Sequence, residues 1–516
     1  MSAIKNGVDP RTGLYTVSVS LPEIPTNDLR GLGFNLAFAY SPLNTQDRGY
    51  GYGWGAHLSQ YIPGTQILSL STGETFKVTG SDSASGQLLM KEKKLDTFHF
   101  YQESSTRYRV MHKSGMVEVL EVQGSTQNRV AMPVEIHSPT GHKVTLGYKT
   151  FSGENRILDW VKDDSGQTLL TINRDSVFIE MLLHPYGGAD GGPLARFVMT
   201  LEASTKYVSR ITLPDNLASW RFGYRLINEH LCMSAVETPS GGREELFYQD
   251  LGHQFPPSSG RAPLPRVTRH IIHPGSDQAP LDVRYTYKSD DPSQSEHNFL
   301  GGGLTIPWTD DGLDNLYKYI GTYNYACIET LWVDDQPVRK MERTYNQFHL
   351  LTSEATTQNN NVETVETTYF LTPDVPYEQQ PSYCQLPKSV KTIWSVLDNP
   401  NRRRSETVSN TYDNFGNLRT QTQANGIVET TTWFPAAGGD GCPPDPEGFV
   451  RQMKDITVTP APLKDDQSPV LCTRYRYKAL PPLAGSPLKN WLTIESTTLV
   501  QITGNQETEL ERTLLE

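Results

Sequence analysis

The sequence predicts an all-β protein, an array of antiparallel β-hairpins joined into one long sheet. Residues 14–21 and 34–40 alternate apolar with polar side chains, which is the pattern of half-buried strands. Turn glycines follow such stretches at a regular spacing, and a fixed period indicates an array of like units. Counted with glycine and without tyrosine, apolar residues make up about 39% of the chain, below the usual value of about 45–50%. This low fraction favours a sheet one layer thick.

The charge balance argues against a nucleic-acid-binding protein. The 516 residues include 46 Lys and Arg against 58 Asp and Glu, a net charge of −12. No broad basic surface is therefore available to bind phosphates, and we expect no nucleic-acid partner. The length corresponds to about three ordinary domains or to one large repetitive architecture.

The amino-terminal sequence bears on localisation. The first ten residues contain no apolar segment of the kind found in cleavable signal peptides. No run approaches 18 apolar residues, so we expect no membrane span. If the protein leaves the cell, we expect a non-classical route, through a dedicated secretion machine or lysis, from a bacterial cytoplasm to the extracellular space or a target cell.

Residues 1–60 form an amino-terminal β region that ends in a run of alternating glycines and aromatic residues. Tyr50, Tyr52 and Trp54 stand between the glycines at residues 49–55. These rings could form a surface that stacks on carbohydrate. The alternative is a tight corner, where glycines let aromatic side chains pack against the backbone.

Residues 61–255 carry the regular spacing and are predicted to be a hairpin array. Turn positions at 115, 141, 166, 191, 216 and 241 are separated by 25 or 26 residues, enough for two strands of roughly ten residues and two turns. Asn216 replaces glycine at one position, as expected where a left-handed conformation is needed. Two units agree further, because Gly141 leads to Tyr148 and Gly241 leads to Tyr248.

Residues 256–340 interrupt this rhythm with proline- and glycine-rich segments, and we expect an irregular insertion there. A second array is predicted over residues 341–516. Residues 344–351 align with residues 411–418 at an offset of 67. A third unit starts near residue 474, and the sequence reaches Glu516 before another turn.

The second array contains a recognisable motif. Tyr412-Asp413-Asn414-Phe415-Gly416-Asn417-Leu418 matches the YD-repeat signature, in which Tyr412, Asp413, Gly416, Asn417 and Leu418 are the signature residues. The chain therefore resembles the Rhs/YD-repeat family, which includes bacterial Rhs proteins and the B and C components of insecticidal toxin complexes. Residues 7–13 and 51–54 are similar to the amino-terminal region of such proteins, so the resemblance covers essentially the whole chain.

The resemblance implies a spiral of β-hairpins wound into a cocoon-like shell. Such a shell encloses a toxic carboxy-terminal segment and hands it to a delivery device. In the family, a self-cleaving core and a toxin domain follow the repeats, whereas this sequence ends while the repeats are running. We therefore expect an incomplete shell without enzyme activity. Its expected partners are its own or an associated toxin as cargo, and a secretion or toxin-complex delivery component.

No cofactor or metal site is expected. The five cysteines contain no CxxC pair (Cys232, Cys327, Cys384, Cys442 and Cys472), so neither a zinc site nor a disulfide framework is indicated. His270 and His273 would reach one ion only on a helix or turn, because residues three apart in a strand face opposite ways. The acidic turns at 163–166 and 310–314 could hold Ca²⁺, although Asp and Gly also suit turns without an ion.

Two rival functions remain open at this point. The first is an extracellular carbohydrate-binding protein that recognises cell-surface glycan through exposed aromatic rings. The second is a β-propeller hydrolase, whose blade period of about 40–45 residues differs from the spacing seen here.

Overall fold

The computed structural model describes residues 4–124, 129–152, 155–215, 218–288, 292–462 and 468–515. Its described regular structure is almost entirely strand, as predicted. The short 3₁₀ helices of these residues are η1 (Asn27–Leu29), η2 (Pro257–Ser259), η3 (Pro292–Gln294), η4 (Leu316–Lys318) and η5 (Tyr377–Gln379).

A small sheet is built from the amino-terminal residues. It contains β1 (Ile4–Val8), β2 (Tyr15–Ser20), β3 (Ala37–Tyr40) and β4 (Trp54–Ala56) in this order. A separate two-stranded ribbon follows, formed by β8 (Gly80–Ser81) and β9 (Leu88–Leu89).

The other described strands form one antiparallel sheet of 30 strands. The hairpins of β5 (Gln60–Ile62), β6 (Ile67–Ser69) and β7 (Thr75–Lys77) join it where Tyr61 pairs with Ala131. The sheet then follows the chain through β10 (Phe98–Gln102), β11 (Arg107–His112), β12 (Val117–Gln123), β13 (Val130–His137), β14 (Lys143–Thr150), β15 (Arg156–Asp163), β16 (Thr168–Arg174), β17 (Phe178–Leu183), β18 (Ala195–Leu201), β19 (Val208–Thr212), β20 (Ser219–Ile227), β21 (His230–Glu237), β22 (Arg243–His253), β23 (Leu264–His273) and β24 (Leu281–Thr286).

The second part of the sheet continues in the same order. Its strands are β25 (Asn324–Val333), β26 (Gln336–Asn346), β27 (Leu351–Gln358), β28 (Asn361–Tyr369), β29 (Pro387–Val396), β30 (Asn399–Tyr412), β31 (Leu418–Thr422), β32 (Val428–Trp433), β33 (Met453–Thr459), β34 (Val470–Leu480), β35 (Trp491–Thr503) and β36 (Gln506–Leu514).

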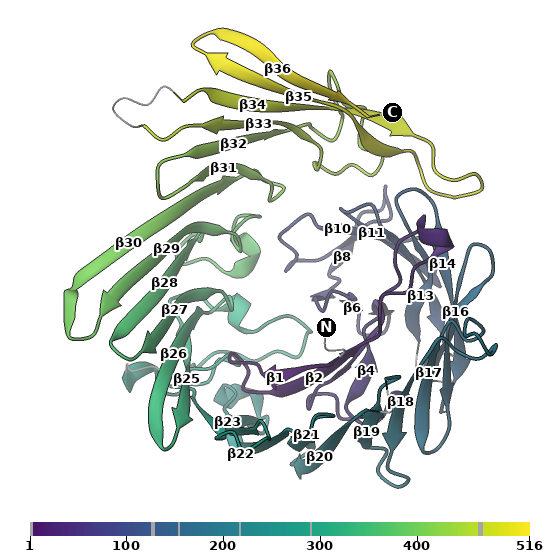
Figure 1. The fold of residues 1–516 in the computed structure, drawn as a ribbon, viewed down its shortest axis with the longest axis vertical. Helices are drawn as coiled ribbons and strands as arrows, with labels where there is room; N and C mark the ends of the chain where they lie inside the picture. Colours follow the sequence, from purple (N-terminus) through teal and green to yellow (C-terminus); the bar gives the residue numbers. More distant parts are fainter. Residues whose placement is uncertain are drawn as a thin grey trace.

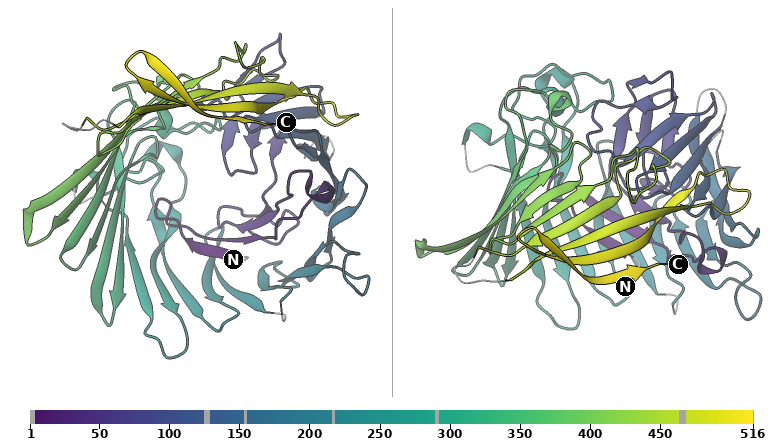
Figure 2. Two further views of the ribbon diagram at one scale, coloured as in Figure 1. Left: turned by 45° about the horizontal axis from the view of Figure 1, so that its top comes forward. Right: turned by 90° about the horizontal axis from the view of Figure 1, so that it is seen from above.

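The large sheet curves into an open ring. Figure 1 shows its strands following one another around the ring, with β1, β2 and β4 on the inner side of β18–β21. The left view of Figure 2 shows the same arrangement of the purple amino-terminal strands inside the ring. The amino-terminal sheet therefore covers the concave face of the first part of the large sheet.

The main hydrophobic core lies between these two layers. Tyr15, Phe38 and Trp54 of the small sheet are fully buried, and they belong to one cluster with Leu170 and Met199 of the large sheet. Strand β17 shows why the sequence folds this way, since its side chains alternate between half-buried and buried along its whole length. That alternation places every second side chain in the core.

The second part of the large sheet is different. Strands β27, β28 and β29 contain no buried residue, and all nine residues of β36 are exposed. Their side chains are half-buried or exposed on both faces, which is the single layer that the composition predicted.

The sheet winds as a spiral, because its late turns lie against its early turns. Arg451 Nη1 donates a hydrogen bond to the Lys113 carbonyl at 2.6 Å, and the Leu483 amide donates to the Thr140 carbonyl at 2.8 Å. The early turns follow the odd-numbered strands β11 and β13, whereas the late loops follow the even-numbered β32 and β34. Consecutive strands are antiparallel, so the two sets belong to opposite rims, and the sheet advances along its axis as it winds.

Two details of the predicted organisation are refined. The interruption predicted at residues 256–340 contains β23, β24, all of β25 and the start of β26, so the irregular part narrows to the segment between β24 and β25. Apart from β22, the strands of the first array are shorter than the roughly ten residues predicted, because turns and bulges take up part of each unit. Gly115, Gly141, Gly166, Gly191 and Gly241 all have positive φ, as the turn assignment requires, and Asn216 lies outside the described residues.

Candidate functional site: an aromatic ladder in a single-layer wall

The YD signature forms the turn between β30 and β31. The Asp413 carboxylate accepts hydrogen bonds from the amides of Phe415, at 2.8 Å, and Asn417, at 2.9 Å, which closes the turn through a side chain. Gly416 has a φ of 78°. A Cβ at this position would come within 2.8 Å of Leu95, so glycine is needed for both backbone conformation and close packing.

Asn417 connects this turn to two other parts of the spiral. Its side-chain amide donates to the Val450 carbonyl at 2.9 Å, and its Oδ1 accepts a hydrogen bond from Lys113 Nζ at 2.7 Å. Asn417 is 7% exposed, so these bonds are sheltered from water. The signature asparagine thus ties a late turn to the start of the sheet.

The unit at residues 344–351, which aligns with residues 411–418, has the same turn geometry. Asn346 takes the place of Asp413, and its Oδ1 accepts from the amides of Phe348, at 3.0 Å, and Leu350, at 3.1 Å. His349 stands at the glycine position with a φ of 59°. An asparagine oxygen therefore replaces the carboxylate without changing the turn.

Tyr412 belongs to a series of aromatic residues that we call the aromatic ladder. Its hydroxyl donates to the Pro387 carbonyl of the preceding strand at 3.1 Å, and burial raises the pKa of this hydroxyl. The same type of bond recurs along the sheet. The donors and acceptors are Tyr148 to Pro133, Tyr224 to Val208, Tyr248 to Met233, Tyr287 to Val267, Tyr369 to Leu351 and Trp433 to Leu418, at 2.6–2.9 Å.

Every rung except Tyr287, which follows the end of β24, coincides with a β-bulge, including Tyr148 at the Gly147/Tyr148 shift. Register shifts occur at Gly223/Tyr224, Phe247/Tyr248, Thr368/Tyr369, Thr411/Tyr412 and Thr432/Trp433. The rungs are also linked, because Tyr369 stands opposite Pro387, which accepts from Tyr412. Tyr412 in turn stands opposite Leu418, which accepts from Trp433. Bulges bend and twist a sheet, so bulges repeated along the sheet contribute to the curvature of the wall.

The ladder lies on the concave face. Trp54 Nε1 of the amino-terminal sheet donates to the Tyr224 hydroxyl at 3.4 Å, and the rings of Tyr40 and Tyr224 lie 5.9 Å apart. Tyr148 and Tyr248 pack against the same core cluster. Tyr412 occupies the equivalent rung in the uncovered part, so its face of β30 is the concave one. Because side chains alternate along a strand, Glu406 shares this face and Thr407 points to the convex side.

The aromatic residues considered for glycan stacking lie mainly inside the protein. Trp54 is 0% exposed and Tyr50 is 5% exposed, and the Tyr50 hydroxyl accepts a hydrogen bond from the Leu158 amide at 3.0 Å. Tyr52 is half-buried beside Tyr207, with ring centroids 5.7 Å apart. In this arrangement, Trp54 and Tyr50 present no ring face to a sugar, which agrees with the alternative of a packed corner.

The possible metal ligands have protein partners. His270 Nε2 lies 2.7 Å from Glu244 Oε2 in a buried network, and the Tyr15 hydroxyl donates to the same carboxylate oxygen. Although burial raises it, hydrogen bonds from His270 and Tyr15 bring the pKa of Glu244 below its usual value. His273 lies beside Glu245 instead. Within the described residues, no group of three or more His, Cys, Asp or Glu side chains is placed to hold a metal ion.

Residues 91–99 and the adjoining turn at 113–116 form a hub that contacts the later loops. Lys94 Nζ donates to the Glu378 and Gln380 carbonyls at 2.8 Å, and the Glu92 carboxyl accepts from the Asp314 amide at 2.8 Å. Burial, together with the charge of Asp314, raises the pKa of Glu92 to about 7. The hub joins the irregular segment to the start of the sheet. The sequence did not predict these contacts.

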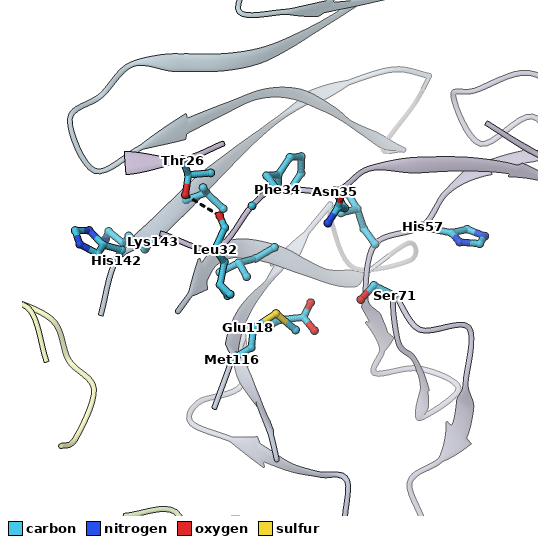
Figure 3. Close-up of a pocket in the computed structure, with 14 residues that line it drawn as sticks. Thr26, Leu32, Phe34, Asn35, His57, Ser71, Met116, Glu118, His142 and Lys143 are labelled. Atoms are coloured by element: carbon cyan, nitrogen blue, oxygen red, sulfur yellow. Dashed lines mark hydrogen bonds between the residues drawn. The ribbon is translucent and has the colours of Figure 1, made fainter. Parts of the chain in front are cut away.

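A small cavity of about 170 Å³ lies where the segment after β2 crosses β13 and β14 (Figure 3). Its Glu118 carboxylate already accepts from Ser59 Oγ at 3.0 Å and lies 2.7 Å from His112 Nε2. Thr26 Oγ1 likewise donates to the Leu32 carbonyl at 2.7 Å, shown dashed in Figure 3. These polar groups therefore already have hydrogen-bond partners within the protein, and we interpret the cavity as a gap in the packing between the two layers.

Comparisons with known proteins give distant structural likenesses. No family model matches the chain, and no curated protein sequence matches it. A chain of the Photorhabdus luminescens Tc holotoxin pore, in a TccC3 point variant, shares 8% identity over 97% of this chain, with a TM-score of 0.27. This chain spans 36% of that chain.

The amino-terminal domain of the effector protein SpvB from Salmonella typhimurium is a second structural neighbour. It shares 13% identity over 50% of this chain and 99% of its own, with a TM-score of 0.21. Both likenesses are too distant to assign a function. No helix among the described residues is long and apolar enough to cross a membrane.

Proposed function

We propose that this chain is a wall segment of a toxin shell of the Rhs/YD-repeat type, which encloses a polypeptide toxin and helps to deliver it. One observation carries the proposal: a single-layer sheet winds as a spiral and keeps its concave face largely uncovered from β25 onward. A sheet of ordinary globular proteins buries one face against a second layer. Here the aromatic ladder joins several pairs of neighbouring strands, and the concave face remains available to a cargo.

The chemistry of that face suits an unfolded polypeptide. Strands β27 and β28 are rich in Thr, Ser and Glu side chains, which offer hydrogen bonds without a continuous apolar surface that would capture a folded core. The motif at residues 412–418 supports the same assignment through its resemblance to YD-repeat proteins. The toxin itself, and any catalysis, would belong to another segment or another chain, so we propose no enzymatic role for residues 1–516.

Strand β36 suggests how a partner would be joined. It is exposed along its length and carries Glu507, Glu509 and Glu511, charges that protect a sheet edge from unspecific pairing. A partner strand bearing basic side chains could extend the sheet there by strand addition. We propose that a delivery component or a further shell segment occupies this edge, and that the assembly leaves the bacterial cytoplasm by a non-classical route.

The test begins with the coding sequence. The gene is read beyond codon 516 and into the adjacent frame, and the polypeptide encoded there is co-expressed with the chain. We expect it to co-purify and to resist trypsin until the chain is unfolded. A polypeptide that purifies separately, or that trypsin digests as fast as the free polypeptide, would overturn the shell assignment.

A further inference from the structure

A second cavity, outside the aromatic ladder, has the charge of a ligand site. It measures about 750 Å³ and lies between residues 44–65 and the ends of β12, β13 and β15. Small-molecule sites in proteins commonly measure about 300–1,000 Å³. The shell function proposed above makes no use of this cavity.

The charged residues that line the cavity are all arginines. Arg48, Arg129 and Arg156 line it, and none of its described lining residues is acidic. Within the described residues, none of the three guanidinium groups forms an ion pair with a carboxylate, although the chain as a whole carries a net charge of −12. Like charges gathered around one cavity repel one another, so the arrangement favours a ligand that brings negative charge.

An acidic residue does lie next to one of these arginines, but it is paired with a different residue. Asp47 precedes Arg48 directly, yet its carboxylate binds Arg174 Nη2 at 2.7 Å. The same carboxylate accepts from the amides of Gly49, at 2.8 Å, and Gly51, at 3.0 Å. Asp47 is therefore fully occupied in holding the loop that carries Arg48.

The remaining lining groups suit a hydroxyl-rich ligand. Five amide side chains are among the described lining residues, namely Asn44, Gln46, Gln60, Gln123 and Asn155, and Ala56, Leu58 and Met132 supply apolar surface. Amides donate and accept hydrogen bonds as sugar hydroxyls do, while arginine pairs with carboxylate, sulfate or phosphate through two parallel bonds. Arg156 Nη1 donates to the Thr150 hydroxyl, whereas Arg156 Nε is buried and has no hydrogen-bond partner among the described residues.

Part of the cavity wall is held by contacts within the protein. Arg129 Nη2 donates to the Ser105 carbonyl at 3.1 Å, and Lys77 Nζ donates to the Thr65 carbonyl at 2.7 Å. The pairing of Tyr61 with Ala131 joins the hairpin of β5 and β6 to β13. Groups held in this way lose little further freedom on binding, which favours affinity.

We propose that this cavity binds an acidic saccharide, a short oligosaccharide that bears carboxylate or sulfate groups. The three arginines bind the acidic groups, the amides bind the hydroxyls, and the apolar surface contacts the sugar ring. The site is independent of the shell function, and it would let the chain bind an acidic glycan coat on a cell.

Isothermal titration calorimetry with the full chain tests the proposal. The probes are a heparin-derived tetrasaccharide, trigalacturonic acid, neutral maltotriose and inorganic sulfate. The variant R48Q/R129Q/R156Q is compared with R210Q/R402Q/R403Q, which removes the same charge from exposed arginines outside the cavity. We expect at least one acidic saccharide to bind, with at least tenfold weaker affinity in the cavity variant and unchanged affinity in the control.

A further variant separates the contribution of the amides from that of the charge. Gln60→Ala leaves the charge unchanged and removes one amide, so it should weaken the binding of the acidic saccharide several-fold while the protein keeps its far-ultraviolet circular dichroism. Binding that is equally weakened in both triple variants would be non-specific charge attraction and would overturn the proposal. Absence of binding by both acidic saccharides, or sulfate that competes as strongly as the saccharide, would overturn it as well.

Discussion

The two parts of the large sheet share one repeat but differ in what covers them. From β14 to β23 the concave face packs against the amino-terminal sheet, and side chains such as Leu170 and Met181 are fully buried. From β25 onward the same bulges and ladder bonds occur, yet strands β27–β29 bury no residue. Local register and side-chain-to-backbone bonds therefore suffice to set the strand order. In the covered part we expect the second layer to add stability through the apolar side chains that it buries.

The largest expected difference between the two parts concerns apolar truncation. Leu170 is 0% exposed, so Leu170→Ala should lower the free energy of unfolding by about 3–5 kcal/mol, since it removes buried contacts and leaves a cavity. Leu471→Ala, at a half-buried position of β34, should cost less than half as much. Urea unfolding followed by tryptophan fluorescence compares the two midpoints. Equal losses would mean that the late sheet is covered by a second layer.

The next effect concerns the overlap of the spiral, which is the contact between the loop around Arg451 and the early turn at Lys113. Arg451 Nε binds the Asp445 carboxylate at 2.7 Å, and Asp445 has a side chain only 2% exposed. Arg451→Gln should destabilise the overlap by about 2–3 kcal/mol, because a buried charge loses its partner but keeps two backbone donors.

Amide hydrogen exchange measures this effect. Exchange should accelerate in residues 93–115 as well as around residue 451, because the Lys113 carbonyl also loses its donor. Lys489→Gln, which removes an exposed charge from the adjoining loop, is the control and should leave residues 93–115 protected. Acceleration confined to the residues around 451 would contradict a coupled overlap.

A smaller effect is expected from pH at the hub. Burial raises the pKa of Glu92 from 4.5 to about 7, so the folded chain holds this proton more tightly than the unfolded chain does. Ionisation therefore favours the unfolded chain, and this residue makes stability fall as pH rises from about 4.5 to 7. Thermal unfolding of Glu92→Gln across this range should show a flatter pH dependence than the unmodified chain. Glu378→Gln, at a mostly exposed carboxylate of the same region, should keep the original slope.

The smallest effect is that of single ladder bonds. Tyr412→Phe removes one hydrogen bond to the Pro387 carbonyl, which should cost about 0.5–1.5 kcal/mol. Tyr224→Phe should cost more, because its acceptor, the Val208 carbonyl, lies in the covered part and Trp54 Nε1 also loses its acceptor. Differential scanning calorimetry of both variants shows which of them loses more stability. A larger loss from Tyr412→Phe would mean that the ladder matters more where no second layer covers it.

Much of the fold follows from local sequence. The glycine turns and the alternation of apolar side chains predict a hairpin array because each depends on residues close together in the chain. Tyr148 and Tyr248 were visible as repeated positions after their turns, and Tyr412 was visible through its motif. The hydrogen bonds of these tyrosine hydroxyls could not be predicted. Their acceptors, the carbonyls of Pro133, Met233 and Pro387, lie in the preceding strand and carry no sequence signal.

Long-range features could not be read from the sequence. The burial of Trp54 depends on Tyr224, far along the chain, and the hub depends on contacts of residues 91–99 with segments beyond residue 310. The three arginines of the cavity come from separate segments, and only the fold brings them to one cavity and pairs the neighbouring Asp47 with Arg174 instead. The aromatic residues of the ladder are unevenly spaced in the sequence, and no spacing connects Arg48 with Arg129 either.

A matched pair of photo-crosslinkers tests the central claim most directly. A benzoyl-phenylalanine replaces either Glu406, on the concave face of β30, or the adjacent Thr407, on the convex face, in the chain co-expressed with the polypeptide encoded downstream. Both positions are exposed on a strand that no second layer covers. The wall proposal predicts that the crosslinker at residue 406 captures the polypeptide and the one at residue 407 does not. Equal capture at both residues, or capture at 407 alone, would contradict it.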